Sequence, residues 1–542
     1  MEKKIFLAIF IVFVMFPALI PNSIFPEPIF LSLLSLIFLV LGIFHWKTRA
    51  YKITLFSPVS LSLLFFYGWG AMGYFYTGSL DSSYAPIVQY WGVIFIFLGL
   101  TLYIKDETDL HSFLWVGLLC AAVHSISVAL QVIPTQWSLE LETTDTITHF
   151  RNRNIFSSYI LFFPPIALFL RSYSSSRLTK FIADLLFVLI MVIFWLAGSK
   201  GGEGAIIVEL LIISVYFLYK NDRQGLKSLV VLVLASTILY HSAILFSKNN
   251  SINLKPESFS RPIAEAMAPG RSLAQRIYYW QGTWAIIKDH WLTGTGPATY
   301  SLLAPLYLAM FEDPVNAING SSMDPSHAHN LYLQFAAELG VIGIGLFFLL
   351  IYFIYSKSYC LFRDNNSPRN DLNFFMVVSI TGYLLHGIFE YNWGYAEYLY
   401  TFTILVFIVD FSIRKNSPDI SEPKRLFLQG FPVFLYVLIL IGGTVISKYF
   451  FYLKAIKSTN ISANQTSVVL VKNITRAKEF CTNCGEPSLV LGNSFLQQYY
   501  STHSFSFLKS SHHEFETALK KKPFRLEVFT ISNSNLYSSR KF

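Results

Sequence analysis

The chain has 542 residues, of which 54% are hydrophobic and only 13% are charged, and its formal net charge is +9. Soluble domains carry roughly 25% charged residues, so this composition excludes an ordinary soluble protein and predicts an all-α polytopic membrane protein. In such a protein the positive charge lies mainly in loops, and it does not indicate nucleic-acid binding. Four cysteines are too few for a disulfide scaffold.

Apolar segments of suitable length recur along the chain, because a membrane-crossing helix needs roughly 20 apolar residues. The first follows the basic start MEKK, and we interpret it as a retained span because no small-residue cleavage pattern follows it. We predict about 12–13 transmembrane helices, at residues 5–20, 27–44, 53–73, 86–104, 111–133, 154–170, 181–198, 204–219, 228–246, 331–355, 373–390, 395–413 and 427–446.

Basic residues fall in alternate connections between these segments, whereas the short connections near Asn22, Gly78 and Trp393 contain none. Positively charged loops remain in the cytoplasm, so this alternation predicts the sidedness of the whole chain. The predicted divisions are N-terminal transmembrane helices at 1–246, an extracytoplasmic loop at 247–330, C-terminal transmembrane helices at 331–447 and an extracytoplasmic tail at 448–542.

The tail contains HHEFETALKKKPF at 512–524, which has the shape of the second helix of a tetratricopeptide-type repeat. Cys481 and Cys484 lie in the same tail, and no histidine or second CxxC pair follows to complete a haem or zinc site. A local disulfide and a pair of free thiols both remain open.

An amphipathic helix is predicted within the large loop, at residues 271–288 (RSLAQRIYYWQGTWAIIK). Its apolar residues Ile277, Trp280, Trp284 and Ile287 are three or four positions apart, which is typical of a helix lying in the membrane interface. A packing helix with a solvated arginine is the alternative. The glycine-containing segment 294–297 predicts a turn, and an anion-binding loop is the less favoured alternative.

Several cations break the sidedness rule or add to it on the outer side. Arg151, Arg153 and Lys200 stand at predicted outer ends of helices, and the loop adds Arg271 and Arg276. Pairing with nearby carboxylates or snorkelling to headgroups would explain them structurally. We favour the functional interpretation, in which they hold an anion at the outer surface.

Two histidines and an asparagine, His327, His329 and Asn330, directly precede the apolar segment at 331–355. Ionisable groups at a membrane boundary indicate either a functional site or a helix anchor, and residue types alone do not separate the two. Carboxylates within or beside the spans, including Glu338 and Glu390, are expected to orient the basic groups.

Together these groups suit a substrate with a lipid tail in the bilayer and a diphosphate at headgroup depth. Arginine and lysine bind a diphosphate and stabilise it as a leaving group, and a neutral histidine takes the proton of an attacking hydroxyl. The outer loop has no DxD-like pair, so we expect neither a metal ion nor another cofactor.

The segments QRIYYWQGTWAIIKDHWLTGTGPATY and SHAHNLYLQFAAELGVIGI resemble the O-antigen ligase family, whose superfamily includes O-antigen polymerases and bacterial O-oligosaccharyltransferases. RNRN at 151–154 and SKGG at 199–202 are similar to two weaker blocks of the family, although Lys200 stands where the family usually has arginine. By this resemblance His329 takes the essential histidine and Arg276 the arginine of the loop helix.

The resemblance implies transfer of a glycan from undecaprenyl diphosphate to an acceptor at the periplasmic face of the bacterial inner membrane. Our leading hypothesis is a ligase whose acceptor is lipid A-core. A polymerase or a protein-directed transferase using the same donor remains open, because the acceptor is not encoded in the donor site. A lipid-linked-sugar flippase fits less well, since the charges gather at one rim and no internal repeat is evident.

Overall fold

The computed structural model describes residues 27–47, 56–104, 106–132, 153–249, 271–311, 326–364, 368–416, 425–460, 467–502 and 505–521. Over these ranges every regular element is a helix, so the all-α prediction is confirmed. Nine helical stretches in the described ranges are long and apolar enough to cross a membrane, which confirms a polytopic membrane protein.

The predicted spans correspond closely to these helices. The segment 5–20 and residue Arg151 lie outside the described residues. The membrane helices and their short companions are α2 (Glu27–Lys47), α3 (Pro58–Ala71), α4 (Gly73–Tyr76), α5 (Leu80–Tyr103), α6 (Glu107–Val132), α7 (Arg153–Ile160), α8 (Phe163–Tyr173), α9 (Arg177–Ala197), α10 (Lys200–Tyr219), α11 (Arg223–Asn249), α16 (Leu331–Asp364), α17 (Pro368–His386), α18 (Ala396–Asn416) and α19 (Arg425–Asn460).

Among the boundaries that differ from the predicted ones, two bear on the site. The span expected at 154–170 is divided into α7 and α8, because Pro164 and Pro165 lack the amide hydrogens that a continuous helix would use. The span expected to run to Glu390 ends at His386, so Glu390 lies in the connection to α18 and not inside the membrane helix. This places its carboxylate at the end of the bundle.

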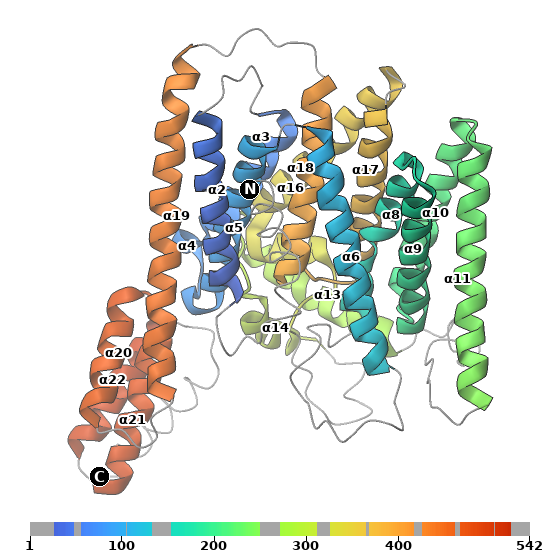
Figure 1. The fold of residues 1–542 in the computed structure, drawn as a ribbon. Helices are drawn as coiled ribbons and strands as arrows, with labels where there is room; N and C mark the ends of the chain where they lie inside the picture. Colours follow the sequence, from blue (N-terminus) through green and yellow to red (C-terminus); the bar gives the residue numbers. More distant parts are fainter. Residues whose placement is uncertain are drawn as a thin grey trace.

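The helices outside the bundle gather at one end of it. Figure 1 shows α13 (Arg271–Asp289) and α14 (Tyr300–Leu308) at the same end as the tail helices α20 (Ser467–Phe480), α21 (Glu486–Thr502) and α22 (Phe505–Lys521). The assignment of this end to the extracytoplasmic side stays a prediction from the basic loops.

A break in α16 at Gly340 fixes the large loop to the bundle. Gly340 has φ +68°, and a Cβ atom there would lie 2.3 Å from the carbonyl oxygen of Leu292. The amide of Val341 donates instead to the carbonyl of Trp291 at 2.8 Å. Only glycine fits this left-handed conformation and close approach, so the chain following α13 inserts against α16 at this point.

Glu338, one turn ahead of the break, also holds this loop. Its buried carboxylate accepts hydrogen bonds from the backbone amides of Ala298 at 3.0 Å and Tyr300 at 3.1 Å, and from the Gln334 side chain at 2.8 Å. We expected Glu338 to orient a basic group, but its hydrogen-bond partners are two backbone amides and the Gln334 side chain. The amides of Thr295 and Gly296 donate to the carbonyls of Ala337 at 3.0 Å and Glu338 at 2.9 Å, so the glycine segment is bonded to α16.

The tail is attached to the bundle through Asp81 at the start of α5. Its carboxylate accepts hydrogen bonds from the Gly485 amide at 2.7 Å and from the Tyr452 hydroxyl at 2.7 Å. Cys481 and Cys484 form a disulfide in the turn just before Gly485, which settles the alternative left open by the sequence. The tetratricopeptide-like character of α21 and α22 stays a prediction.

Candidate functional site

His327 and His329 converge on one buried carboxylate. His327 Nε2 lies 3.0 Å from Glu390 Oε1, and His329 Nδ1 lies 2.9 Å from the same oxygen. The two rings are 4.2 Å apart between centroids. The structure thus brings together the predicted histidine pair and a carboxylate from the connection between α17 and α18.

Glu390 remains a charged acceptor at this position. Burial raises the pKa of the Glu390 carboxyl, but hydrogen bonds from His327 and His329, together with the charge of these rings when protonated, outweigh burial. The pKa therefore lies well below its usual range, so the carboxylate is ionised at neutral pH. The amide of Tyr391 adds a third hydrogen bond to Oε1 at 3.1 Å.

The two histidines differ in which ring nitrogen remains available. His327 uses Nε2 toward Glu390 and Nδ1 toward the Ser326 hydroxyl at 2.7 Å, so both of its nitrogens are engaged. His329 uses Nδ1 toward Glu390, and its Nε2 makes no hydrogen bond to another described residue. With the Nδ1 proton directed at the carboxylate, Nε2 carries a lone pair and can accept a proton. This geometry makes His329 the candidate general base.

The backbone around His329 is held in an uncommon conformation. His329 has φ +49°, a left-handed value that is sparsely populated by residues with a side chain. Asn330 stabilises it, since its Oδ1 accepts from the amides of Tyr332 at 3.0 Å and Leu333 at 2.9 Å as the cap of α16. Its Nδ2 donates to the Ile388 carbonyl at 2.9 Å, so Asn330 ties the histidine segment to the segment carrying Glu390.

One face of α13 covers the histidines. Tyr279 stacks on His329 with ring centroids 5.9 Å apart and planes 12° apart. Trp280 Nε1 donates to the Ala328 carbonyl at 3.1 Å. Arg276 precedes Tyr279 by three positions and Trp280 by four, so it lies on the same helical face. Its side chain is half-buried, and its charge acts on His386. The helix therefore carries Arg276 on the face that packs on the histidine segment.

The outward face of α13 supports the interfacial interpretation. Ile277 and Trp284 are 46% and 54% exposed, whereas Tyr278 and Ile286 are buried against the protein. The apolar residues singled out in the sequence therefore include exposed ones, and the buried face is formed largely by tyrosines. Exposed tryptophan and isoleucine beside a membrane bundle suit contact with lipid.

A chain of hydrogen bonds links the other two sequence blocks to Glu390. Asn154 Nδ2 donates to Glu390 Oε2 at 3.1 Å, and the Ser199 hydroxyl donates to Asn154 Oδ1 at 2.8 Å. Ser199 caps α10 by accepting from the Gly202 amide at 3.3 Å. RNRN, SKGG and the histidine segment thus meet at one carboxylate.

The predicted cations are distributed around this network. Lys200 directly follows Ser199 as the first residue of α10, and its side chain is exposed. Arg153 directly precedes Asn154 at the start of α7, and Arg271 begins α13, but their side chains lie outside the described residues. Lys200 and Arg153 are therefore the sequence neighbours of Ser199 and Asn154, whose hydrogen bonds lead to Glu390.

The cluster also has the donors of a cation site. One ligand atom each from His327, His329 and Glu390 lie within 4.8 Å of one another. Two imidazoles and a carboxylate are a common ligand set for zinc, with an open position for water or substrate. An ion there would replace the two N–H···O contacts with Glu390, so hydrogen bonding and metal binding are mutually exclusive uses of these nitrogens.

The residues that sequence reasoning missed are uncharged members of this network. It singled out the basic residues of RNRN and SKGG, whereas Asn154 and Ser199 make the described contacts with the site. Deeper in the bundle, the Ser158 hydroxyl contacts His386 Nδ1 and accepts from Asn392 Nδ2 at 2.6 Å. The sequence feature that could have identified these residues is their position at the ends of apolar segments, where a polar side chain must find a hydrogen-bond partner.

Comparison with known protein families gives a match. Residues 185–348 match the family model described as O-antigen ligase. The match covers α10, the large loop and the histidine segment, while Asn154 and Glu390 lie outside it. No curated protein matches the sequence significantly. The chain is a multi-pass membrane protein whose residues 185–348 are similar to the O-antigen ligase family model.

Proposed function

We propose that the protein transfers a glycan from undecaprenyl diphosphate to lipid A-core at the periplasmic face of the inner membrane. The observation that carries the proposal is the shared contact of His327 and His329 with Glu390. The family domain supports a glycosyltransferase-type activity with lipid-linked glycans.

In the proposed reaction His329 acts as the general base. The acceptor hydroxyl gives its proton to His329 Nε2 while its oxygen attacks the anomeric carbon of the donor sugar. The bond between that carbon and the diphosphate oxygen breaks, and the polyprenyl diphosphate leaves. Glu390 holds the imidazole in the required tautomer and stabilises its positive charge after proton transfer, as a carboxylate does in hydrolase triads.

The cations are proposed to bind the departing diphosphate. Arg276 offers a planar guanidinium that can form paired hydrogen bonds to phosphate oxygens, whereas Lys200 contributes a more flexible point charge. Arg151, Arg153 and Arg271 are proposed to add positive charge on the same side. No step of this proposal requires a metal ion, although the cluster described above has donors for one.

The test is reconstitution of the purified protein with a lipid-linked glycan and three separate acceptors. These are lipid A-core, a second lipid-linked repeat and a pilin-like protein, and the product is identified by mass spectrometry. Product on lipid A-core supports the ligase function. Product on the lipid-linked repeat alone would identify a polymerase. Product on the protein alone would identify a protein transferase. Either result would refute lipid A-core as the acceptor.

A matched variant identifies the base. His329→Ala is expected to abolish transfer while donor binding, measured separately with labelled lipid, persists. Turnover equal to the wild-type value in His329→Ala would refute the role of this histidine. A chelator series run in parallel reports whether an ion in the cluster contributes.

A further inference from the structure

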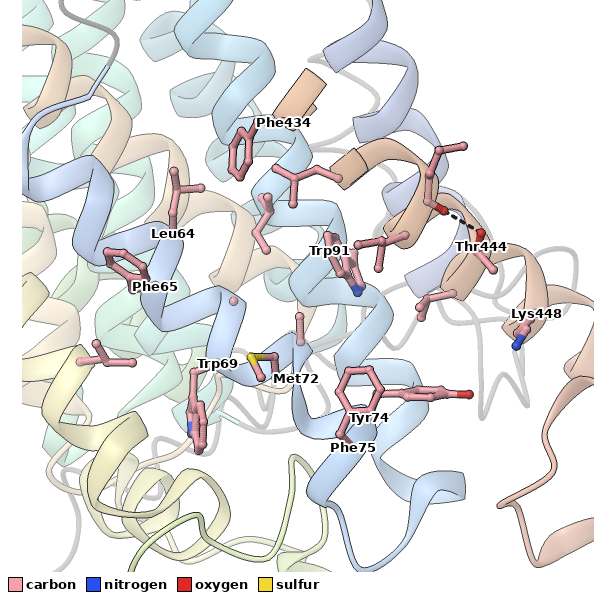
Figure 2. A pocket seen from close by; sticks show the side chains of 18 residues that line it. Leu64, Phe65, Trp69, Met72, Tyr74, Phe75, Trp91, Phe434, Thr444 and Lys448 are labelled. Atoms are coloured by element: carbon pink, nitrogen blue, oxygen red, sulfur yellow. Dashed lines mark hydrogen bonds between the residues drawn. The ribbon is translucent and has the colours of Figure 1, made fainter. Parts of the chain in front are cut away.

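An apolar cavity of about 680 Å³ lies between α19 and the wall made by α3, α4 and α5. Figure 2 shows Trp69, Met72 and Phe75 on one side and Phe434 with Thr444 on the other. The helices that form it are far apart in sequence, and α5, α16 and α19 are candidate membrane spans. The cavity is therefore a groove within the hydrocarbon layer, separate from the histidine cluster.

The lining of the groove is almost entirely hydrocarbon. Thr444 satisfies its hydroxyl within α19 by donating to the Leu440 carbonyl at 2.6 Å. The other polar side-chain groups of the lining are the indole nitrogens of Trp69 and Trp91, the Tyr74 hydroxyl and the Lys448 amine. Figure 2 shows the last two at the same end of the groove. Among the described residues no carboxylate forms an ion pair with Lys448, whose side chain is exposed.

We propose that this groove binds one phosphate-bearing lipid of the outer leaflet. Its hydrocarbon chain would lie along Trp69, Trp91 and Ile441, and its phosphate would contact Lys448 at headgroup depth. A lysine on a membrane helix reaches toward the headgroups, where an anionic lipid compensates its charge. The leaflet follows from the sidedness used in the proposed function, whereas the presence of a lipid in the groove does not depend on that function.

The groove is structurally connected to the segment that holds the reaction site. Trp69 Nε1 donates to the Leu339 carbonyl at 2.9 Å, next to the break in α16. The neighbouring residue, Glu338, holds Gln334, which in turn accepts from the Ala328 amide at 2.7 Å, beside His329. A lipid packed on Trp69 therefore contacts a residue bonded directly to the helix that positions the histidines.

Two glycines provide a matched test. A Cβ atom added at Gly68, which lines the groove, would meet no atom within 4 Å, and the same holds at Gly345 on α16, outside the groove. Gly68→Phe fills the groove without an initial clash, whereas Gly345→Phe adds the same side chain elsewhere. Both replace a helical glycine, so both are expected to fold.

Native mass spectrometry of the detergent-purified full chain measures the bound phospholipid. We expect occupancy to fall at least roughly fivefold in Gly68→Phe and in Lys448→Ala, and to persist in Gly345→Phe and Lys448→Arg. Equal occupancy in the wild type and Gly68→Phe would overturn the proposal. A photo-reactive residue at position 68 supplies an independent readout. A lipid adduct supports the proposal, and a crosslink to a protein segment overturns it.

Discussion

Asn154 Nδ2 donates a hydrogen bond to Glu390 Oε2 at 3.1 Å, while both histidines contact the other oxygen of the same carboxylate. The carboxylate is therefore held from two sides, by α7 through Oε2 and by the histidine segment through Oε1. Asn154 in turn is oriented by Ser199, the cap of α10. Glu390 is the point at which three separated parts of the sequence are bonded together.

This relationship predicts a positioning role for Asn154. Asn154→Ala removes one hydrogen bond to a charged group, worth about 1.5 kcal/mol, and should lower kcat roughly tenfold with little change in acceptor KM. Asn154→Asp should be worse, because it places a second carboxylate beside Glu390. Steady-state kinetics with a lipid-linked donor measures both, and the Asn154→Ala defect should include an altered pH profile. An unaltered kcat in both variants would contradict the role.

The two histidines are expected to behave differently. His329→Ala should reduce kcat by about 10²–10⁴-fold, the usual contribution of a general base, whereas His327→Ala should cost less because both its ring nitrogens bond to the protein. Single-turnover measurements separate the chemical step from donor binding. If His327→Ala proves the more severe of the two, the roles of the histidines must be exchanged.

Glu390→Gln should destabilise the protein in a pH-dependent way. Because the folded pKa of Glu390 lies below its ordinary value of 4.5, its ionised form contributes stability fully at pH values above about 4.5. That contribution is lost as the pH falls further. We expect Glu390→Gln to lower the free energy of unfolding by about 2 kcal/mol at pH 7 and by progressively less below pH ~4.5.

Thermal unfolding in detergent at a series of pH values measures this difference. Asp106, a carboxylate elsewhere in the chain near the start of α6, offers a control position through Asp106→Asn. A stability difference for Glu390→Gln that stays constant from pH 7 to pH 3 would show that the ionised carboxylate is not what stabilises the site.

Lys200 offers a gain-of-function test. Lys200→Arg supplies a guanidinium that can form paired hydrogen bonds to phosphate oxygens, so donor KM should fall, whereas Lys200→Ala should raise it several-fold. Arg276→Lys should raise donor KM for the converse reason. Titration with labelled donor lipid gives Kd for the three variants, and an unchanged Kd in Lys200→Ala would remove Lys200 from the diphosphate site.

Glu338→Ala should be a stability variant and not a specificity variant. It leaves the backbone amides of Ala298 and Tyr300 without their acceptor, at a cost of about 1–3 kcal/mol for the buried Tyr300 amide and less for Ala298, which is exposed. Glu338→Gln keeps one acceptor oxygen and should be intermediate. Thermal unfolding and limited proteolysis of the large loop report the effect, and a wild-type melting temperature in Glu338→Ala would contradict it.

Hydropathy was sufficient to predict the helices because the bilayer requires long apolar segments whose backbone is satisfied internally. It failed at the ends of α7 and α17, where one proline pair and a polar connection, respectively, set the boundaries. Residue types alone also identified the histidine pair, since imidazoles at a membrane boundary are costly to retain without a function or a partner.

The partner of the histidines could not be predicted in the same way. Glu390 was singled out only as a costly carboxylate, because its pairing depends on the three-dimensional approach of the α17–α18 connection to the start of α16. The same applies to Glu338, whose amide partners are 38 and 40 positions away and carry no sequence signature. Cations attract attention in a sequence, whereas the neutral side chains that orient a carboxylate do not.

The break at Gly340 has a consequence for building chimaeras from related transferases. The loop segment that follows α13, residues 291–296, is bonded to residues 337–341 of α16 through backbone contacts that no side chain can replace. A large loop transplanted by itself would lack the backbone partners in α16 that hold it. The exchangeable module is therefore the loop together with about the first three turns of the succeeding membrane helix, and its junction belongs after Gly340 rather than at the membrane surface.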